Sequence, residues 1–291
     1  MLARMRPPAL LSLVALAFCF LAGHAEAASG CVWKVTSSTG GTLFLGGSVH
    51  ALASTDYPLP SAFNRAFDTS TRIVLEVEPK ALSGSGAGLL KAGSYPRGDS
   101  LKNHVDPRTY DYLRCVFALI RVPEEKFSRY RPWLLVLMLE SPSMRGLSDD
   151  LGVDEFIVKR ARANGKPISG LESAAEHTAV FSGLTDRQSE ALLLLSFIPQ
   201  GNSAGSRERI MNLWRRGDVD ALARSTHDAY RDFPAFGERL LGARNRRWAP
   251  KLEGYLKSGH AYFVVVGAAH LGGADGLLPL LRARGCKVEQ L

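Results

Sequence analysis

Three residues that lie far apart in the sequence have side chains suited to binding a transition metal: His50, Glu76 and His270. Both histidines follow an apolar run and a glycine, in the segments Gly-Ser-Val-His50 and Gly-Ala-Ala-His270, which lie 220 positions apart. Glu76 lies inside the apolar run of residues 73–78, where a carboxylate is costly unless it is paired or binds a cation. Two imidazoles and a carboxylate suit a divalent transition metal that keeps coordination positions open for water.

A metal held in this way would make water nucleophilic near neutral pH and would polarise a substrate carbonyl. A further carboxylate, from Glu78 or Glu172, could serve as general base. The structural alternative is that each histidine is only a loop residue and that Glu76 pairs with an arginine. Four further histidines have no Gly-x-x-His context, and we interpret them as surface or helix residues: His104, His177, His227 and His260.

The elements that must position these residues follow from hydrophobic periodicity. Alternation over residues 32–36 and 42–46, around a Ser/Gly turn, predicts a β-hairpin. Apolar runs predict further strands over residues 72–78, 167–172, 261–266 and 287–291. Helical spacing predicts helices over residues 62–68 and 274–284 and within 106–163 and 185–248, and the Gly/Ser-rich residues 83–88 predict a flexible loop.

Strands that bracket helical blocks favour an α/β fold with a mixed central β-sheet flanked by helices. Ligands of open α/β sheets bind outside the carboxyl ends of the strands. If the strands that precede His50 and His270 are neighbours, we therefore expect the two imidazoles to converge.

The composition agrees with a globular α/β protein. A chain of 291 residues with 46% hydrophobic and 22% charged residues excludes a disordered chain, a collagen-like repeat and a small disulfide scaffold. No change of composition marks a second domain, so residues 28–291 are predicted to form a single domain.

Residues 1–27 have the three parts of a secretory signal peptide. Two arginines precede an apolar run over residues 9–22, and Ala25-Glu-Ala27 supplies a small-x-small cleavage site. Because the run is shorter than the roughly 20 residues that span a bilayer, we favour a cleaved signal over an N-terminal anchor. A lipoprotein site at Cys31 is a weaker alternative. No later apolar stretch is long enough to span a membrane, so we expect an exported, soluble protein of the bacterial periplasm.

Three cysteines follow this leader: Cys31, Cys115 and Cys286. In an oxidising compartment they allow at most one intramolecular disulfide. Cys31 and Cys286 open apolar segments near the two chain ends and could form a disulfide if those segments are neighbouring strands. Cys115 lies in an apolar helical pattern and is predicted to be a buried free thiol.

The net positive charge is concentrated in one block. The formal charge is +8, and it becomes +7 without the leader, which contains two arginines and one glutamate. Residues 207–251 include eleven basic and six acidic residues, a surplus of five positive charges. The first interpretation is a solvated helix face. Arg-Trp pairs in the block could stack on nucleic acid, but an exported protein rarely meets it, so we expect no nucleic-acid partner.

The chain also resembles a known family over nearly its whole length after the leader. Trp33-Lys-Val, followed by residues 41–50, is similar to the opening of the TraB/PrgY/GumN family, which includes the Tiki-type membrane metalloproteases. Further similar segments occur in the same order, at residues 57–60, 66–67, 74–76, 166–172, 244–245, 267–270 and 285–291. An ordered set of this kind is far more specific than a single Gly-x-x-His motif.

The resemblance implies an α/β fold akin to the erythromycin-esterase and haem-binding ChaN-like group, with a helical insertion. It implies that His50, Glu76 and His270 form the metal and catalytic set. Arg244 would lie near that set, where it could bind an acidic substrate group or stabilise an oxyanion. The activity proposed for Tiki-like members is peptide cleavage that depends on manganese or cobalt. The activity proposed for PrgY- and TraB-like members is a reduction of peptide pheromone activity.

Two departures from the family pattern concern the site. Glu176-His177 stands where members often have a Glu-Gln pair, and Gly46-Gly-Ser48 stands where Gly-Thr is usual. Neither departure removes an expected metal ligand. An export signal without a membrane anchor makes the chain more similar to exported bacterial members than to the membrane-bound ones.

Together these observations predict an exported metal-dependent hydrolase that cleaves peptide bonds in a peptide or protein substrate. The expected cofactor is a divalent ion, manganese or cobalt by the resemblance, with zinc as an alternative. The expected catalytic residues are His50, Glu76, His270, Arg244 and Glu172. The alternative function is a non-catalytic periplasmic protein that sequesters a peptide, or a cofactor such as haem bound through His50 or His270.

Overall fold

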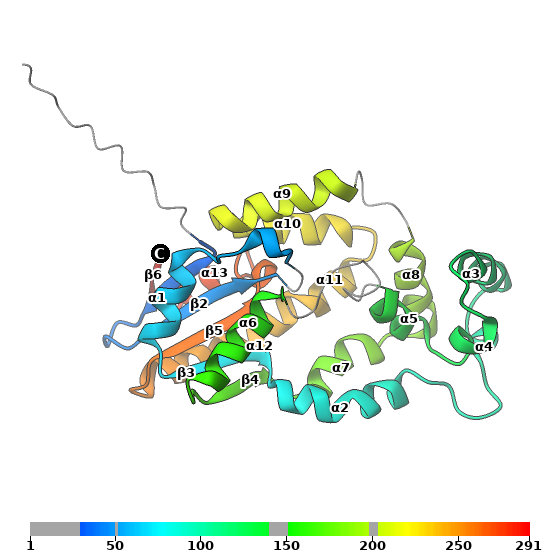
Figure 1. Cartoon of the computed structure of the whole chain (residues 1–291), viewed down its shortest axis with the longest axis horizontal. Coiled ribbons are helices and arrows are strands. Elements are labelled where there is room, and N and C mark those ends of the chain that lie inside the picture. Colours follow the sequence, from blue (N-terminus) through cyan, green and yellow to red (C-terminus); the bar gives the residue numbers. More distant parts are fainter. Residues whose placement is uncertain (1–29, 50–51, 140–150, 198–202) are drawn as a thin grey trace, which may run out of the picture.

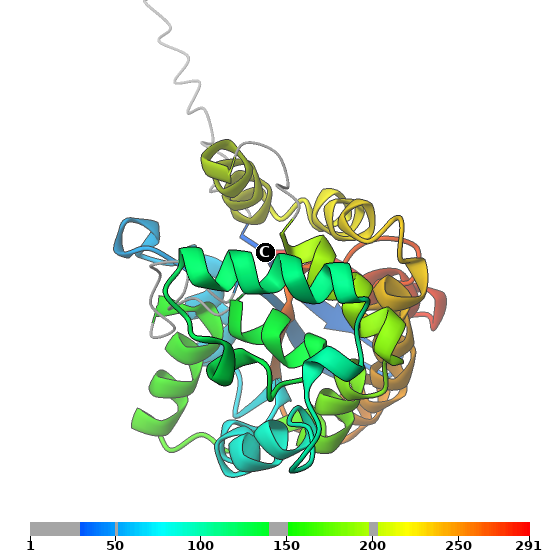
Figure 2. The same ribbon diagram turned by 90° about the vertical axis from the view of Figure 1, so that its right-hand side faces the viewer.

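The structure is a computed structural model that describes residues 30–49, 52–139, 151–197 and 203–291. A six-stranded sheet lies at one end of the molecule, and a group of helices extends away from it (Figure 1). Figure 2 looks at the opposite end, where these helices stand in front of the sheet. The predicted class, α/β with a mixed sheet, is confirmed.

The sheet has the strand order β4-β3-β5-β2-β1-β6. Its strands are β1 (Val32–Thr36), β2 (Thr42–Ser48), β3 (Arg72–Val77), β4 (Ile168–Glu172), β5 (Tyr262–Gly267) and β6 (Lys287–Gln290). The four neighbours β4, β3, β5 and β2 are parallel. β1 is antiparallel to β2, as the predicted hairpin requires, and also to β6. The carboxyl ends of four parallel strands therefore meet at one edge of the sheet.

Helices cover both faces of this sheet. The α-helices in the described residues are α1 (Ser61–Thr69), α2 (Pro79–Ala92), α3 (Pro107–Leu119), α4 (Glu124–Phe127), α5 (Pro132–Leu139), α6 (Val153–Ala163), α7 (Ala174–Ser182), α8 (Asp186–Ser196), α9 (Ser203–Arg216), α10 (Val219–Ala229), α11 (Pro234–Leu240), α12 (Gly242–Lys257) and α13 (Leu277–Ala283). Phe263 of β5 packs against Phe63 of α1, whereas its neighbour Tyr262 stacks on Tyr255 of α12. Because successive strand residues point to opposite faces, α1 and α12 lie on opposite sides of the sheet.

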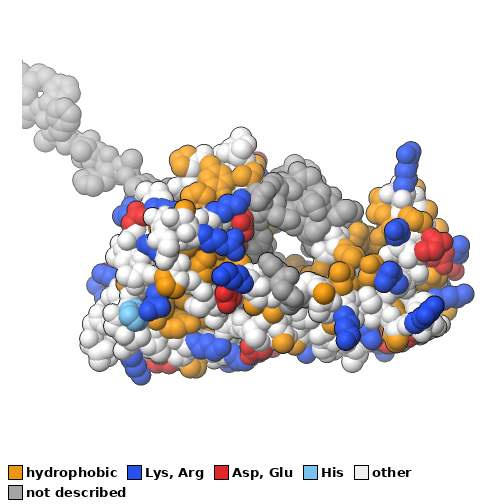
Figure 3. All heavy atoms as spheres, turned by 60° about the horizontal axis from the view of Figure 1, so that its bottom comes forward, with side chains coloured by type: hydrophobic (Ala, Val, Ile, Leu, Met, Phe, Trp, Pro, Cys, Tyr) orange, Lys and Arg blue, Asp and Glu red, His pale blue; other side chains and the backbone are white. Residues whose placement is uncertain are grey.

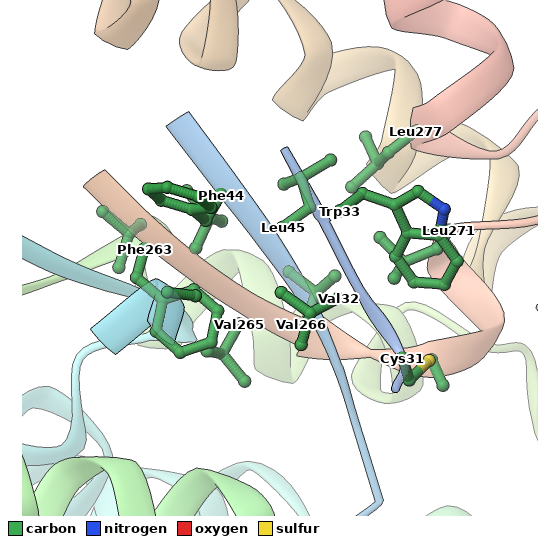
Figure 4. Close-up of a cluster of buried hydrophobic side chains, with 14 of the residues drawn as sticks. Cys31, Val32, Trp33, Phe44, Leu45, Phe263, Val265, Val266, Leu271 and Leu277 are labelled. Atoms are coloured by element: carbon green, nitrogen blue, oxygen red, sulfur yellow. The ribbon is translucent and has the colours of Figure 1, made fainter. Parts of the chain in front are cut away.

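Two clusters of buried apolar side chains hold these elements together. The first lies around the sheet, and Figure 4 shows part of it, where residues of β1, β2 and β5 pack with Leu271 and Leu277. The second lies among the outlying helices, including α3, α5, α8 and α11, and contains Leu113, Leu135 and Phe236. Among the described residues, no helix is both long enough and apolar enough to cross a membrane.

One predicted loop is wrong. Residues 83–88, expected to be flexible, lie within helix α2. Glycine lowers helix propensity by about 1 kcal/mol per residue relative to alanine, which is why the composition suggested a loop. The helix forms because Pro79 stands at its start, where the missing N–H costs nothing, and because α2 packs against α7.

The three cysteines in the part of the chain that the structure describes are free thiols, and two expectations about them change. Cys115 is exposed, so the prediction of a buried thiol is wrong: α3 buries the face that carries Tyr110, Leu113 and Phe117, and Cys115 lies on the other face. Cys31 and Cys286 do lie beside neighbouring strands, β1 and β6. Those strands are antiparallel, however, so the two thiols lie at opposite ends of the pair, beyond disulfide reach.

Positive charge is spread over the surface shown in Figure 3, where basic side chains alternate with acidic and apolar ones. Two arginines of the basic block, Arg207 and Arg215, form ion pairs with the buried carboxylate of Asp56. Arg246 of the same block pairs with Glu238. These contacts agree with a largely solvated helical block, and Arg244 differs from its neighbours because it is buried.

Candidate metal centre

The candidate centre lies at the carboxyl ends of the four parallel strands. β4 ends at Glu172, and Glu76 is the last residue but one of β3. β5 ends at Gly267, and a short 3-10 turn then leads to His270. β2 is the direct parallel neighbour of β5, so the condition for convergence of the two Gly-x-x-His segments is met. His50 itself, like the segment predicted to be a signal peptide, lies outside the described residues.

Arg244 of α12 joins these strand ends. Its Nη2 atom donates to Oε2 of Glu76 at 2.5 Å and to Oε1 of Glu172 at 2.7 Å. Its Nε atom donates to both oxygens of Glu172, at 3.1 and 3.2 Å. Its Nη1 atom lies 3.1 Å from Nε2 of His270 and 3.2 Å from the carbonyl oxygen of Leu240. With 3% of its side chain exposed, the guanidinium is almost withdrawn from solvent.

The tautomer of His270 follows from its neighbours. The amide nitrogen of Asn245 donates to the carbonyl oxygen of Asp275 at 2.9 Å, so the amide oxygen of Asn245 faces the histidine. That oxygen lies 2.6 Å from Nδ1 of His270, which must therefore carry the proton. The neutral ring then has its lone pair on Nε2, which lies 3.7 Å from Oε1 of Glu76. A histidine fixed in this way is preoriented as a metal ligand.

Gly267 allows this close arrangement. Its backbone N–H donates to Oε1 of Glu76 at 2.7 Å. A Cβ atom at this position would lie 3.3 Å from the same oxygen and 3.5 Å from Cδ2 of His270. The first contact is tighter than most Cβ contacts in proteins, so a side chain here would crowd the carboxylate. The glycine of the second Gly-x-x-His segment thus brings β5 close to Glu76.

His177 is a member of the cluster that the sequence reasoning missed. It was expected to be a surface or helix residue, and it does lie in the first turns of α7, but its Nδ1 atom lies 2.9 Å from Oε1 of Glu172. The signal that could have found it is Ser173-Ala-Ala-Glu176, a capping box that starts α7 directly after β4. About a third of the His177 side chain is exposed, which makes it the accessible side of the cluster.

The charges of the cluster stabilise one another. Burial disfavours the ionised form of Glu172, but hydrogen bonds from His177 and Arg244, together with the guanidinium charge, outweigh it and lower the pKa of Glu172. Burial likewise disfavours the charged form of Arg244, yet the carboxylates of Glu76 and Glu172 raise its pKa. Arg247 adds a more distant positive charge, 3.6 Å from Oε2 of Glu172. Glu172 and Arg244 are therefore both ionised near neutral pH.

The donor atoms are of the types and spacing that a metal requires. Glu76, Glu172 and His177 each offer one ligand atom, and these atoms lie within 4.8 Å of one another. Two carboxylates and an imidazole suit a divalent transition metal, and His270 adds a second imidazole beside Glu76. These side chains can therefore hold a metal ion, although Arg244 now contacts their donor atoms.

Four of the five residues expected in the site are in this cluster: Glu76, Glu172, Arg244 and His270. Of the two candidate bases, Glu172 contacts Arg244, whereas Glu78 precedes α2 as its N-cap residue. His177 and Asn245 are the additions made by the structure.

Comparison with known proteins gives the family of the chain. The chain is similar to "Uncharacterized protein YbaP" of Escherichia coli (strain K12), with 23% identity over 246 residues, or 81% of this chain and 86% of that protein. The protein of the same name from Shigella flexneri gives the same values. No solved structure matches the chain significantly. The profile of the TraB/PrgY/gumN family matches residues 31–290, from the residue before the first strand to the end of the last. The chain therefore belongs to the TraB/PrgY/gumN family.

Proposed function

We propose that this protein is an exported hydrolase that uses a divalent metal ion to cleave peptide bonds. The observation that carries the proposal is the cluster of Glu76, Glu172, His177 and His270, whose ligand atoms gather where the parallel strands end. Membership of the TraB/PrgY/gumN family supports it, because the resemblance to Tiki-like members implies metal-dependent peptide cleavage. The ion would be held by Glu76 and His270 together with His50, and manganese, cobalt and zinc are the candidates.

Each residue of the cluster has a distinct task in this proposal. A bound divalent ion would supply Lewis acidity that activates water and polarises the scissile carbonyl. Asn245 holds the lone pair of His270 on Nε2, and Gly267 positions Glu76 through its N–H group. Arg244 pairs with the carboxylates in the metal-free protein, and once it has released them its positive charge can stabilise a developing oxyanion beside the ion.

Proton transfer is better assigned to a pair than to Glu172 alone. Only 1% of the Glu172 side chain is exposed, and its oxygens already accept bonds from Arg244 and His177. Because an ionised carboxylate only accepts, Nδ1 of His177 carries the proton that Glu172 binds. The Nε2 atom of the neutral ring then has the lone pair, and we propose that it accepts a proton from water while Glu172 orients the ring.

Metal analysis tests the first part of the proposal. The wild type, loaded with Mn²⁺, Co²⁺ or Zn²⁺ and then desalted, should retain about one ion per chain. His50→Ala/His270→Ala should retain none, and His260→Ala, at an exposed site, should behave as the wild type. Equal and negligible metal in the wild type and the double variant would refute the proposal.

Peptide digestion followed by mass spectrometry tests the second part. We expect metal-dependent fragments of an unstructured peptide mixture, and we expect them to be lost with Glu76→Gln. Binding of peptides without cleavage in any metal would favour the binding-protein alternative instead. Haem binding through His50 or His270 would produce a Soret absorption band, which the hydrolase proposal does not predict.

Export and domain organisation belong to the same proposal. We propose that residues 1–27 are removed during export to the periplasm and that residues 28–291 form one domain. Pairing of β1 with β6 supports a single domain, because strands from both ends of the described chain lie side by side. N-terminal sequencing of protein from the periplasmic fraction should begin at Ala28. A cytoplasmic protein that begins at Met1 would contradict the export proposal.

A further inference from the structure

The guanidinium of Arg244 contacts the carboxylate oxygens that a metal ion would need, and it lies close to the ring of His177, whose Nδ1 carries a proton. Its Nη2 atom lies 2.5 Å from Oε2 of Glu76, 2.7 Å from Oε1 of Glu172 and 3.4 Å from Nδ1 of His177. Those three residues are the ones whose ligand atoms lie within 4.8 Å of one another. One nitrogen of Arg244 is thus within 3.4 Å of every residue of this ligand set.

The same guanidinium also engages the other ligand set. Asn245 fixes the proton of His270 on Nδ1, so Nε2 has one lone pair, and Nη1 of Arg244 lies 3.1 Å from that atom. A neutral imidazole cannot give this lone pair to a metal and to an N–H donor at the same time. A metal ion bound through His270 and Glu76 therefore also requires Arg244 to move.

Electrostatics leads to the same conclusion. The carboxylate of Glu172 is almost fully buried and that of Glu76 is 14% exposed, so the pair requires a cation, and the guanidinium provides it. A divalent ion within about 4 Å of the guanidinium would repel it strongly in an environment of low dielectric constant. The cluster therefore accommodates one of these cations at a time.

We propose that Arg244 and a divalent metal ion are alternative occupants of this cluster, so that metal entry requires Arg244 to release Glu76, Glu172 and His270. The inference rests on the proposed function only in assuming that the protein binds such an ion. Contacts outside the carboxylates remain available to the released side chain. The guanidinium carbon lies 4.5 Å from the ring of Trp248, and Nη1 contacts the carbonyl oxygen of Leu240, at the end of α11.

The inference predicts that weakening Arg244 strengthens metal binding. The affinity for Mn²⁺ can be measured from the loss of the free-ion electron paramagnetic resonance signal, and the affinity for Co²⁺ from its visible absorption. Arg244→Gln should bind about 100-fold more tightly than the wild type, because exchange no longer breaks charge-assisted hydrogen bonds. Arg244→Lys keeps the charge but loses the bidentate geometry, so about tenfold tighter binding is expected.

Two controls locate the effect. Adding Glu172→Gln to Arg244→Gln should weaken binding again by at least about tenfold, because a ligand or its charge is removed. Arg246→Gln, which alters a half-exposed arginine paired with Glu238, should leave the affinity unchanged. Retention of tight binding by the double variant would mean that the ion binds elsewhere, and would overturn the inference.

The remaining outcomes are also decisive. Folded Arg244 variants, checked by circular dichroism, that bind metal no more tightly than the wild type would overturn the inference. If Arg244→Gln fails to fold, the metal affinity of Arg244→Lys alone tests the inference, and binding no tighter than that of the wild type would overturn it. No metal binding by any of the proteins would overturn the inference and the proposed function together. Tighter binding by the variants without peptide cleavage by the wild type would refute the hydrolase alone.

Discussion

Replacing Glu172 by glutamine should strongly destabilise the metal-free protein, although the substitution exchanges only one heavy atom. The Glu172 side chain is 1% exposed and accepts hydrogen bonds from Nε and Nη2 of Arg244 and from Nδ1 of His177. Loss of one partner of a buried ion pair typically costs about 3–5 kcal/mol, because the remaining charge stays buried. Glutamine keeps the shape and one acceptor, and Glu76 still pairs with Arg244, so we expect about 3 kcal/mol.

Urea unfolding in the presence of a chelator, followed by tryptophan fluorescence, would measure this loss. Glu176→Gln is the matched control, because Glu176 is an exposed capping residue of the same helix start and its loss should cost about 1 kcal/mol or less. A double-mutant cycle of Glu172→Gln with Arg244→Gln should give a coupling free energy of about 2 kcal/mol. A loss below about 1 kcal/mol with additive variants would show that this contact does not stabilise the strand ends.

Three further predictions concern His104, Cys115 and Gly267. Hydrogen bonds to Asp186 and a second aspartate raise the pKa of His104 above 6.5, so its ion pairs stabilise the fold below that pH, and the stabilisation is lost as the pH rises through the folded-state pKa. The urea midpoint of the wild type should therefore fall more than that of His104→Gln between pH 6 and about pH 9, and parallel curves would contradict this. Because Cys115 is exposed while the other described cysteines are buried or half-buried, a thiol reagent should label one site rapidly, and Cys115→Ser should abolish that phase. Gly267→Ala should weaken metal binding about tenfold, because the added methyl group crowds Glu76. The control is Gly254→Ala, in open space within α12, which should stabilise the fold by up to about 1 kcal/mol without affecting metal binding. Equal effects of the two substitutions on metal affinity would argue against the crowding.

The sheet could be predicted well because its signals are local. In each strand, apolar and polar residues alternate or all residues are apolar. A glycine, a proline or a polar residue follows near the observed end of the strand. Placement of Glu76 and His270 at one edge followed from the rule that parallel strands present their carboxyl ends together. The sequence could not show that β2 and β5, which are more than 200 residues apart, are neighbours. Their adjacency was therefore only a condition for the convergence of the two Gly-x-x-His segments.

Other features depended on tertiary contacts that no local pattern contains. Arg244 lies in a basic block that reads as a solvated face, and it is buried because Trp248, one turn later, packs on its guanidinium while Glu76 and Glu172 neutralise it. His177 enters the site through the register of a helix cap rather than through a histidine motif. Helix α2 forms although its composition favours a loop, since packing on α7 outweighs intrinsic propensity.

The pairing of the first and last strands has a consequence for the order of folding. β1 needs β2 on one side and β6 on the other, and the register that joins Trp33 to Gln290 links positions almost at the two ends of the described chain. Contacts of such large sequence separation form late, because a long loop must close before they contribute. One side of β1 therefore stays unpaired until residues 287–290 are present. The first strand thus remains without one of its neighbours until residues 287–290 have been synthesised, and under the proposed export this delay would help to keep the chain unfolded during translocation.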